Sequence, residues 1–421
     1  MNIPVMIKEV LNRITQEGYE AYLVGGAVRD YVFEVESKDY DICTNMPLEK
    51  VKELFPKFAI MKPNNNRQTG IMRIDGKDIE ISEFKGKDLL EDLSNRDFTI
   101  NAIAMDQNGN IIDPYNGIES LQKGELSLIK KDGEAFKNDS LRILRAVRIA
   151  ARMNFSIDEN CKAKMNESKE LLKNIPAERI YRELIQLLVT DNPAYYIRES
   201  KDVFFQIIPE LKPMDKFEQH NKWHLYDVFE HTLKVLENTP KNIYLRLAAL
   251  FHDIGKPEKF FTDDEGIGHF YGHPEASAKI FDEISVRLKM DNKTKKVVRL
   301  LIEKHDMTMS KKSDKIYAFI KEYGIDFIPL LFALKRADNK GQNPELANPV
   351  LEELSNTEQL YQEHILRFNN LQINGQKLLE MGFKSKKIKL VLEDIRKMVV
   401  TQRIENDEKT ITEYINKRFK V

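Results

Sequence analysis

The chain has 421 residues, which is too long for one hydrophobic core and predicts about two to four domains. Its 66 basic and 67 acidic residues nearly cancel, so any nucleic-acid contact has to come from local basic patches. The two cysteines, Cys43 and Cys161, exclude a disulfide framework and a cysteine-rich zinc site. We expect a soluble, cytoplasmic protein with no membrane partner, because no apolar run reaches the roughly 18 residues of a span and no signal-peptide pattern is present.

Residues 1 to about 135 combine helix and strand signals. The predicted elements are a helix from Val5 to Glu17, a buried strand from Ala21 to Val24, a turn at Gly25-Gly26, a helix from Ala27 to Phe33, a strand with Asp39 and Asp41, a helix from Leu48 to Phe55 and a hairpin around Asp75-Gly76. Beyond this region nearly everything to residue 421 has helical period. The pattern predicts an α+β fold, with a small head of mixed sheet and helices followed by an elongated all-α remainder.

Asp39 and Asp41 form the first candidate site. Side chains of a strand alternate between its faces, so both carboxylates project from the same face and repel each other. The usual counter-charge is a pair of Mg²⁺ ions that bridge the phosphates of a substrate. Glu80 offers a third carboxylate if its strand pairs beside the first. The alternative for Glu80 is a solvated acidic face of an edge strand.

Gly25 and Gly26 stand between a predicted strand and a predicted helix. Glycines at such a junction leave backbone N–H groups accessible to a phosphate, and the helix N-terminus adds partial positive charge. A glycine pair alone is more often a simple turn. Because the aspartate pair follows thirteen residues later, we expect a phosphate cradle beside a metal site.

Four motifs carry a family resemblance. In chain order they are Leu23-Val24-Gly25-Gly26-Ala27-Val28-Arg29-Asp30, Asp39-Tyr40-Asp41-Ile42, Arg96-Asp97-Phe98-Thr99-Ile100-Asn101-Ala102 and Asp139-Ser140-Leu141-Arg142-Ile143-Leu144-Arg145. They resemble the head and neck motifs of bacterial class II tRNA nucleotidyltransferases. This family adds the 3′-terminal CCA of tRNA, includes bacterial poly(A) polymerases and belongs to the polymerase-β-like superfamily.

The resemblance implies a polymerase-β-like head whose substrates are CTP, ATP and the tRNA 3′ end. Asp39 and Asp41 would bind the catalytic Mg²⁺, and Gly25 and Gly26 would hold the triphosphate. The other nucleotide-binding residues would be Arg29, Arg96, Asp97, Asn101, Asp139, Arg142, Arg145 and Arg148, with Asp97 on the ribose 2′-hydroxyl. The implied reaction is in-line attack of a 3′-hydroxyl on the α-phosphate, without a covalent intermediate.

Base choice has a physical interpretation at Asp139 and Arg142. Spaced three apart on a predicted helix, they share a face. A carboxylate accepts from the exocyclic amine of cytosine or adenine, while the guanidinium donates to the ring acceptor, so uracil and guanine leave a polar group unpaired. An ordinary ion pair is the default for such spacing, but the order of the motifs favours the base-selecting role.

Three positions depart from the family pattern. Asn95 stands where an arginine is usual, and Asn138 stands where a glutamate is usual, so the group expected to orient Arg142 is uncharged. Only residues 85–88 connect the strand ending at Phe84 to the next helix, where CCA-completing members usually have a longer flexible loop. A CC-adding enzyme is therefore a variant of the main hypothesis.

The neck motif Glu178-Arg179-Ile180-Tyr181-Arg182-Glu183-Leu184 also resembles the family. Arg179 and Glu183 have the spacing of a helical ion pair, worth only about 0.2–0.5 kcal/mol. We expect both to brace the base-selecting helix, and Arg179 is also a candidate RNA contact.

A second constellation begins after residue 210. The residues His231, His252, Asp253, His273, His305 and Asp338 resemble the ligands of an HD domain, a helical metal-dependent phosphohydrolase fold, and Leu250-Phe251-His252-Asp253-Ile254-Gly255-Lys256-Pro257 matches its motif. His231, His252 and Asp338 fall on apolar helix stripes, where a shared divalent metal would offset their desolvation. A lone histidine on such a face is more often a satisfied core residue. Imidazole with carboxylate suits Mn, Fe, Co, Ni or Zn.

The C-terminal tail is basic. Residues 381–421 hold eleven Lys or Arg and six Asp or Glu, a local charge of +5. The family places this end against the tRNA elbow, so Lys386 and Lys387 are predicted phosphate contacts. A solvated face is the alternative.

The prediction is a chain of four domains, acting as a monomer or homodimer. They are a nucleotidyltransferase head at 1–135, a helical neck at 136–210, an HD domain at 211–345 and a helical tail at 346–421. The predicted function is addition of CMP and AMP to tRNA, with a second phosphohydrolase activity that trims damaged 3′ ends. The alternatives are CC addition only, poly(A) polymerase, an HD phosphohydrolase with a nucleotide-binding head, and an RNA-binding adaptor.

Overall fold

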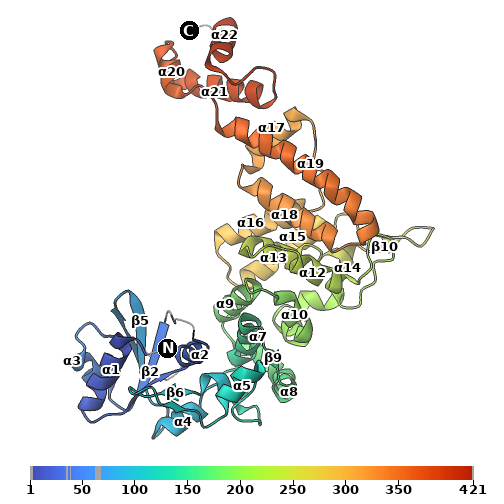
Figure 1. The fold of residues 1–421 in the computed structure, drawn as a ribbon. Helices are drawn as coiled ribbons and strands as arrows, with labels where there is room; N and C mark the ends of the chain where they lie inside the picture. The colour runs from blue at the N-terminus through green and yellow to red at the C-terminus, as the bar shows by residue number, and fades with distance from the viewer. Residues whose placement is uncertain (1–2, 35–36, 38, 62–67, 420–421) are drawn as a thin grey trace. The chain divides into compact units, whose positions relative to one another are not determined.

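The computed structural model describes residues 3–34, 37, 39–61 and 68–419. Two compact units divide the chain, Met1–Pro209 and Glu210–Val421, and each is described by itself (Figure 1). The finer division into four domains stays a prediction. In the described residues, no helix combines the length and the apolar character needed to cross a membrane.

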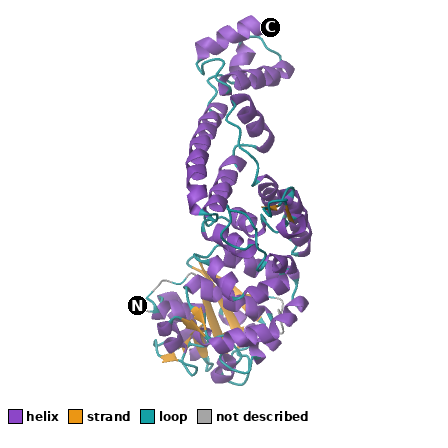
Figure 2. Cartoon of the chain, turned by 90° about the vertical axis from the view of Figure 1, so that its right-hand side faces the viewer, coloured by secondary structure: helices purple, strands orange, loops and turns teal. Residues whose placement is uncertain are grey.

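The first unit contains a seven-stranded mixed sheet in the order β3-β4-β5-β2-β1-β6-β7. Its strands are β1 (Ala21–Val24), β2 (Asp39–Thr44), β3 (Ala59–Ile60), β4 (Thr69–Ile74), β5 (Lys77–Glu83), β6 (Ala104–Met105) and β7 (Ile111–Ile112). The pair β2–β5 is parallel and the other neighbours are antiparallel. This confirms the predicted mixed sheet, which Figure 2 shows as the main group of strands.

The helices and the hairpin of the head form where the sequence signals predicted them. The helices of this region are α1 (Val5–Gln16), α2 (Gly26–Val32), α3 (Leu48–Leu54) and α4 (Leu89–Ser94), with a 3₁₀ turn, η1 (Thr99–Asn101). The α1 helix buries one stripe, Ile7, Val10, Leu11 and Ile14. Asp75 and Gly76, with φ of 50° and 78°, form the predicted β4–β5 hairpin turn, because this turn type needs two positive φ angles.

Helices make up most of the rest of the first unit. They are α5 (Gly117–Lys123), α6 (Glu134–Asn138), α7 (Leu141–Met153), α8 (Glu159–Ser168), η2 (Lys169–Asn174), α9 (Ala177–Leu188), α10 (Pro193–Glu199) and α11 (Lys201–Ile207). One short parallel pair, β8 (Glu125–Leu126) with β9 (Ser156–Ile157), interrupts the predicted all-helical pattern. Two-residue strands are too short to give a periodic signal, so the sequence did not reveal them.

The second unit is helical apart from one antiparallel pair, β10 (Phe261–Thr262) with β11 (Gly268–His269), which the sequence also missed. Its helices are α12 (Val228–Glu237), α13 (Ile243–Phe251), α14 (Lys256–Lys259), α15 (His273–Arg287), α16 (Asn292–Lys304), α17 (Ser313–Tyr323), α18 (Phe327–Lys340), α19 (Pro344–Asn369), α20 (Gly375–Glu380), α21 (Ser385–Val400) and α22 (Glu408–Arg418), after the short η3 (Pro209–Met214). The last three helices share a small core of their own, which includes Leu378, Val391, Ile395, Ile411 and Ile415.

Candidate functional site

Three predicted carboxylates share one face of the head sheet. In the parallel β2–β5 register Asp41 lies opposite Glu80, and Asp39 lies opposite Asp78. Asp39, Asp41 and Glu80 are exposed, whereas the intervening Tyr40 and Ile79 are buried. The edge-strand interpretation of Glu80 is wrong, because β5 lies between β4 and β2. Asp78 pairs instead with Arg73, whose Nε lies 2.7 Å from Oδ1 of Asp78.

Gly25 brings the backbone close to Asp41. Its φ of 68° favours glycine, and a Cβ on this residue would lie 3.3 Å from Oδ2 of Asp41. Gly26 then begins α2. The predicted phosphate cradle therefore lies directly beside the predicted metal site.

One cavity of about 1290 Å³ collects the head and neck residues. The predicted site residues that line it are Gly25, Gly26, Arg29, Asp41, Glu80, Arg96, Asp97, Asn101, Asp139, Arg142, Arg145, Arg148 and Arg179. Asp39 lies at the start of β2 and is not part of the lining. Apart from Asp39, the predicted head and neck residues thus line a single cavity, although they come from six separate stretches of chain.

Asp97 anchors a polar chain across this cavity. Its carboxylate accepts from Asn101 Nδ2 at 2.8 Å and pairs with Arg145 Nη2 at 2.8 Å, and Asn101 Oδ1 accepts from Arg29 Nη1 at 2.9 Å. Burial alone would raise the pKa of Asp97, but Arg145, Asn101 and Arg142 hold that pKa below its usual range. Asp97 is therefore an ionised, buried anchor for two arginines.

A second network fixes Arg96 and Arg142. Arg96 Nη2 pairs with the buried Asp92 at 2.9 Å, and Asp92 Oδ1 also accepts from the backbone N–H of Lys85 at 2.9 Å. Arg142 donates to the carbonyl oxygen of Asn95 at 2.9 Å. Sequence reasoning missed Asp92, for which its spacing of four from Arg96 was the available signal. Backbone carbonyls orient Arg142 where a glutamate was expected to do so.

The predicted helical face shared by Asp139 and Arg142 is wrong. Asp139 has extended backbone, with φ of −150° and ψ of 98°, and lies between α6 and α7. Its Oδ1 accepts from the backbone N–H of Leu141 at 3.2 Å, a local bond that aspartate makes in place of helix. Both residues still line the cavity, because α7 begins two residues later.

Arg179 and Glu183 do not pair with each other in the way their spacing suggested. Arg179 Nη2 lies 3.4 Å from Oδ2 of Asp139, and Glu183 Oε2 accepts from Arg148 Nε at 2.5 Å. Both α9 residues therefore contact residues 139–148, the segment predicted to select the base, and their bracing role stays a prediction.

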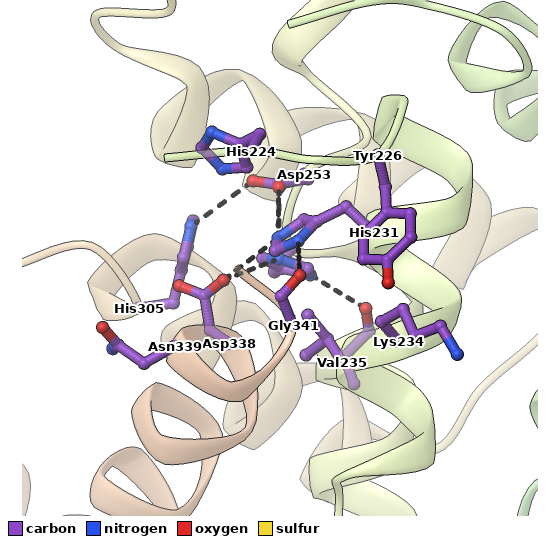
Figure 3. A network of polar contacts seen from close by, with 12 residues as sticks. His224, Tyr226, His231, Lys234, Val235, Asp253, His305, Asp338, Asn339 and Gly341 are labelled. Carbon is purple, nitrogen blue, oxygen red and sulfur yellow. Dashed lines mark hydrogen bonds and ion pairs between the residues drawn. The ribbon is translucent and has the colours of Figure 1, made fainter. Parts of the chain in front are cut away.

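The six HD residues converge in the second unit, and Figure 3 labels His231, Asp253, His305 and Asp338 among them. His231 comes from α12, His252 and Asp253 follow α13, His273 begins α15, His305 follows α16, and Asp338 lies in α18. Among the described residues, the sets of three whose ligand atoms lie within 4.8 Å of one another are His231–His252–Asp253 and Asp253–His273–His305. Asp338 Oδ1 lies 3.1 Å from His231 Nε2 and 3.7 Å from His252 Nε2.

The four histidines are oriented alike by the backbone. Each Nδ1 contacts a carbonyl oxygen, His231 that of Gly341, His252 that of Ala249, His273 that of Phe270 and His305 that of Ile302, at 2.6–3.2 Å. A proton on Nδ1 leaves Nε2 as the lone-pair nitrogen, which is how metal-binding histidines are fixed. All four Nε2 atoms lie within 3.7 Å of an oxygen of Asp253.

The histidine nitrogens and carboxylate oxygens of this cluster are suited to bind a divalent metal ion. His252 Nε2 and Asp253 Oδ1 are buried without a hydrogen bond, whereas Asp253 Oδ2 pairs with the ammonium of Lys256. Burial lowers the pKa of His252, but the negative charges of Asp253 and Asp338 outweigh it and raise that pKa to about 10, so the carboxylates favour a cation at Nε2, and a bound metal would replace the proton there. An arrangement of imidazole nitrogens around shared carboxylates suits one or two transition-metal ions with Asp253 as the common ligand.

Two further residues at this cluster were missed. Lys256 is buried, with Nζ 2.7 Å from Oδ2 of Asp253 and 2.8 Å from Oε1 of Gln219. Its position three residues after Asp253 in the HD motif was an available signal. His224 Nε2 lies 3.4 Å from Lys256 Nζ, and burial together with Lys256 and His231 lowers the pKa of His224 to about 2.

The tail residues Lys386 and Lys387 are exposed on α21. His269, which follows the HD motif in the sequence, pairs with Asp263 at 2.7 Å and belongs to neither ligand set.

Known families match separate parts of the chain, and known structures match nearly all of it. Residues 21–127 match "Poly A polymerase head domain", residues 154–214 match "Probable RNA and SrmB-binding site of polymerase A", and residues 224–340 match "HD domain". The Bacillus stearothermophilus CCA-adding enzyme in complex with CTP is 22% identical, with a TM-score of 0.62 over 99% of this chain and 98% of that chain. The Thermotoga maritima CCA-adding enzyme complexed with tRNA is 21% identical, with a TM-score of 0.64 over 99% and 96%.

At these identities the structural likeness shows the fold, and the family matches show the domains. The predicted resemblance to class II tRNA nucleotidyltransferases with an HD domain is confirmed at that level. The chain therefore joins a poly(A) polymerase head domain, its RNA-binding segment and an HD domain in the fold of CCA-adding enzymes.

Proposed function

We propose that the first unit adds CMP, and in the complete reaction AMP, to the 3′ end of tRNA. The observation that carries the proposal is the position of Gly25 against Asp41, with Glu80 opposite Asp41 in the register. A triphosphate held by the glycine backbone would thus meet the carboxylates at one end of the cavity.

The residues of the head have separate tasks in this reaction. Asp39, Asp41 and Glu80 would hold Mg²⁺, whose charge lowers the pKa of the attacking 3′-hydroxyl and neutralises the leaving pyrophosphate. Two arginines would supply positive charge to the phosphates. Asn101 fixes the direction of the Arg29 side chain, and Asp97 fixes that of Arg145. Catalysis then rests on orientation and electrostatics, because no side chain has to form a covalent intermediate.

The base is chosen without a nucleic-acid template. Asp139, steadied by Arg179, would accept from the exocyclic amine of cytosine or adenine, and Arg142 would donate to the ring acceptor. Uracil and guanine present an acceptor to the carboxylate, and the unpaired polar atoms disfavour them.

Extension of a tRNA that lacks its 3′ CCA, with labelled CTP and ATP, tests the proposal. We expect incorporation by the wild-type protein and none by the Asp39→Ala, Asp41→Ala variant. The matched control is Asp78→Ala, which removes the carboxylate opposite Asp39 that pairs with Arg73. Equal incorporation by the double variant would reject the proposal in favour of an HD phosphohydrolase with a nucleotide-binding head or of an RNA-binding adaptor.

Addition of CC only is a specific variant of this function, supported by the connection after β5. Its backbone is tied to α4: Lys85 N–H donates to Asp92, Lys87 N–H donates to Glu91 at 2.9 Å, and Asp88 caps the helix. A connection held in this way has little freedom to rearrange the site for ATP.

A second function, metal-dependent hydrolysis of phosphate esters, is proposed for the HD domain. It is supported by the four histidines that present Nε2 to Asp253 and by the buried atoms of His252 and Asp253 without hydrogen bonds. Lys256 adds a positive charge for the phosphate beside the ligand set. The task of the HD domain would be to trim damaged RNA 3′ ends, including 2′,3′-cyclic ends, before the head rebuilds them.

Metal content and hydrolysis test this second function together. The wild-type protein should retain a divalent transition metal through dialysis, whereas His252→Ala should lose metal and phosphoesterase activity while incorporating CMP at the wild-type rate. Retained hydrolysis in His252→Ala would reject the HD assignment.

A further inference from the structure

The backbone of Lys85 is held through both of its polar groups by side chains at the end of α4. Its N–H donates to Oδ1 of the buried Asp92 at 2.9 Å, and its carbonyl oxygen accepts from Nδ2 of Asn95 at 3.0 Å. Asp92 lies in α4, and Asn95 directly follows the last residue of this helix. We call these two hydrogen bonds the Lys85 clamp. They fix Lys85 against the end of α4.

On one side, the Lys85 clamp holds the continuation of the strand that carries Glu80. Lys85 follows Glu80 by five residues, at most about 18 Å of chain. The N–H of Phe84 donates to the carbonyl oxygen of Thr44 at 2.8 Å, so the chain still runs beside β2 just before it reaches Lys85. The position of Lys85 is therefore set by the two strands that carry the candidate Mg²⁺ ligands.

On the other side, the clamp holds the backbone that orients Arg142. The carbonyl oxygen of Asn95 accepts from Nη2 of Arg142 at 2.9 Å, and the carbonyl oxygen of Arg96 lies 3.4 Å from Nη1 of Arg142. The side chain of Asn95 thus holds Lys85, while its carbonyl group directs the guanidinium proposed to contact the base. Lys85, Asn95 and Arg142 all line the cavity of the head and neck.

A fixed Arg142 matters for the choice of base. Discrimination between bases requires donors and acceptors that are held to within a fraction of an ångström. Uracil presents an acceptor to the carboxylate of Asp139 and is disfavoured while that acceptor stays unpaired. If the backbone of residues 95–96 could shift, Arg142 would gain freedom to donate to this acceptor, and the mismatch would be offset.

We propose that Asn95 is a positioning residue that determines base specificity, because its side chain anchors to Lys85 the backbone that orients Arg142. This inference rests on the proposed nucleotidyl transfer and adds to it a residue that controls the choice of nucleotide without touching the base.

Asn95→Ala removes the clamp bond to Lys85, and Asn238→Ala is the matched control. Asn95 ends α4 with φ of −89° and ψ of −1°, and Asn238 ends α12 with φ of −86° and ψ of −1°. Each side chain also donates to the carbonyl oxygen four residues earlier at 2.9 Å. Both variants therefore lose the same capping bond, and only Asn95→Ala also releases Lys85.

The measurement is kcat and KM for CTP and for UTP, with the full-length protein, Mg²⁺ and a tRNA that lacks its 3′ CCA. In Asn95→Ala the KM for CTP should rise by roughly 10-fold with kcat within about twofold of wild type, because a base contact is present in both ground state and transition state. The preference for CTP over UTP, as the ratio of kcat/KM values, should fall by roughly 10-fold, the effect of relieving one unpaired polar group. Asn238→Ala should match wild type in every value.

An unchanged CTP-to-UTP ratio in Asn95→Ala, or an equal change in both variants, would overturn the proposal. A loss of kcat alone would also overturn it, since a purely structural role lowers activity without altering the choice of base. Calorimetric titration with CTP and UTP in the absence of tRNA separates this inference from the reaction on which it rests. A preference for CTP that Asn95→Ala loses, in a protein that adds no nucleotide, would keep the role of Asn95 and reject the transfer.

Discussion

At the scale of single residues, the head site depends on a glycine that has no substitute. Gly25 combines a φ of 68° with a Cβ position 3.3 Å from Asp41, so a side chain there strains the backbone and presses on the carboxylate that we propose binds metal. Gly76 has a similar φ, 78°, but nothing lies within 4 Å of its Cβ position. The two glycines therefore separate backbone strain from crowding of the site.

We predict that Gly25→Ala lowers the rate of CMP incorporation by about 100-fold, the usual effect of displacing a catalytic group by roughly 1 Å. Gly76→Ala should lower the free energy of unfolding by about 1 kcal/mol and leave incorporation unchanged. Single-turnover kinetics and urea unfolding measure the two effects. Equal losses of activity in both variants would contradict the close contact with Asp41.

The buried Asp97 gives a pH-dependent prediction. Because the pKa of its carboxyl is lowered in the folded protein, its contribution to stability is complete above the unfolded value of about 3.9 and is lost as the pH falls through the folded value. Asp97→Asn should reduce the free energy of unfolding by about 2 kcal/mol at pH 7, since it removes the charged acceptor that pairs with the half-buried Arg145.

Urea unfolding at pH 7, 5.5 and 3.5 checks this expectation. The difference between wild type and Asp97→Asn should be equal at the two higher pH values and smaller at pH 3.5. The control, Asp78→Asn on the half-exposed pair with Arg73, should cost less than about 1 kcal/mol. A difference that grows as the pH falls would show that Asp97 is not held ionised by its arginines.

Residue-level predictions from the sequence succeeded where a motif fixed both residue type and spacing. The aspartates of β2 share one face of the sheet, as strand alternation predicted, and the HD residues cluster in the second unit, as their motif and their positions on apolar helix faces predicted. Lys256 and Asp92 were missed although their spacings of three and four residues from Asp253 and Arg96 offered a local signal. The partner of Glu183 is different, because Arg148 lies 35 residues away and a one-dimensional pattern does not describe such a contact.

At the scale of elements, the long periodic segments were predictable and the short junctions were not. The strand Ala21–Val24 has the predicted bounds, and α1, α3 and the β4–β5 hairpin agree closely, since each has a clear apolar period or turn signal. The prediction that Asp139 is helical failed because its side chain accepts a hydrogen bond from the backbone of Leu141, and such a bond competes with helix formation at the aspartate itself.

The connection of residues 85–88 carries an element-scale prediction. Its attachment to α4 through Asp92 and Glu91 should stop synthesis at two added cytidines, with AMP addition slower than CMP addition by about 100-fold. Inserting a flexible Gly/Ser segment after Gly86 should raise the rate of AMP addition, and the same insertion in the exposed turn at Gly76 should not. Efficient AMP addition by the wild-type protein would rule out the CC-only variant.

At the scale of the whole molecule, the chain combines two units with separate chemistry. The tail belongs to the second unit and has its own small core, so its lysines can be changed without disturbing either candidate site. Because the net charge of the chain is close to zero, binding of a polyanion such as RNA has to rely on local basic patches.

We predict that Lys386→Gln with Lys387→Gln weakens tRNA binding and lowers the slope of log affinity against log salt by roughly 2, about one per phosphate contact. The choice of nucleotide should not change, because contacts to phosphate carry no information about the base. Filter binding across a salt series measures the slope, with Lys293→Gln and Lys296→Gln on α16 as the matched pair of exposed lysines. An unchanged slope would remove the tail from the RNA interface.

The most direct test of the account is the length of the product on a tRNA without its 3′ CCA, resolved to single nucleotides. We predict that the wild-type protein adds cytidine from CTP, that Asp41→Asn adds none, and that His252→Ala adds cytidine at the wild-type rate. Absence of cytidine addition by the wild-type protein, or its persistence in Asp41→Asn, would contradict the assignment of nucleotidyl transfer to the β2–β5 carboxylates.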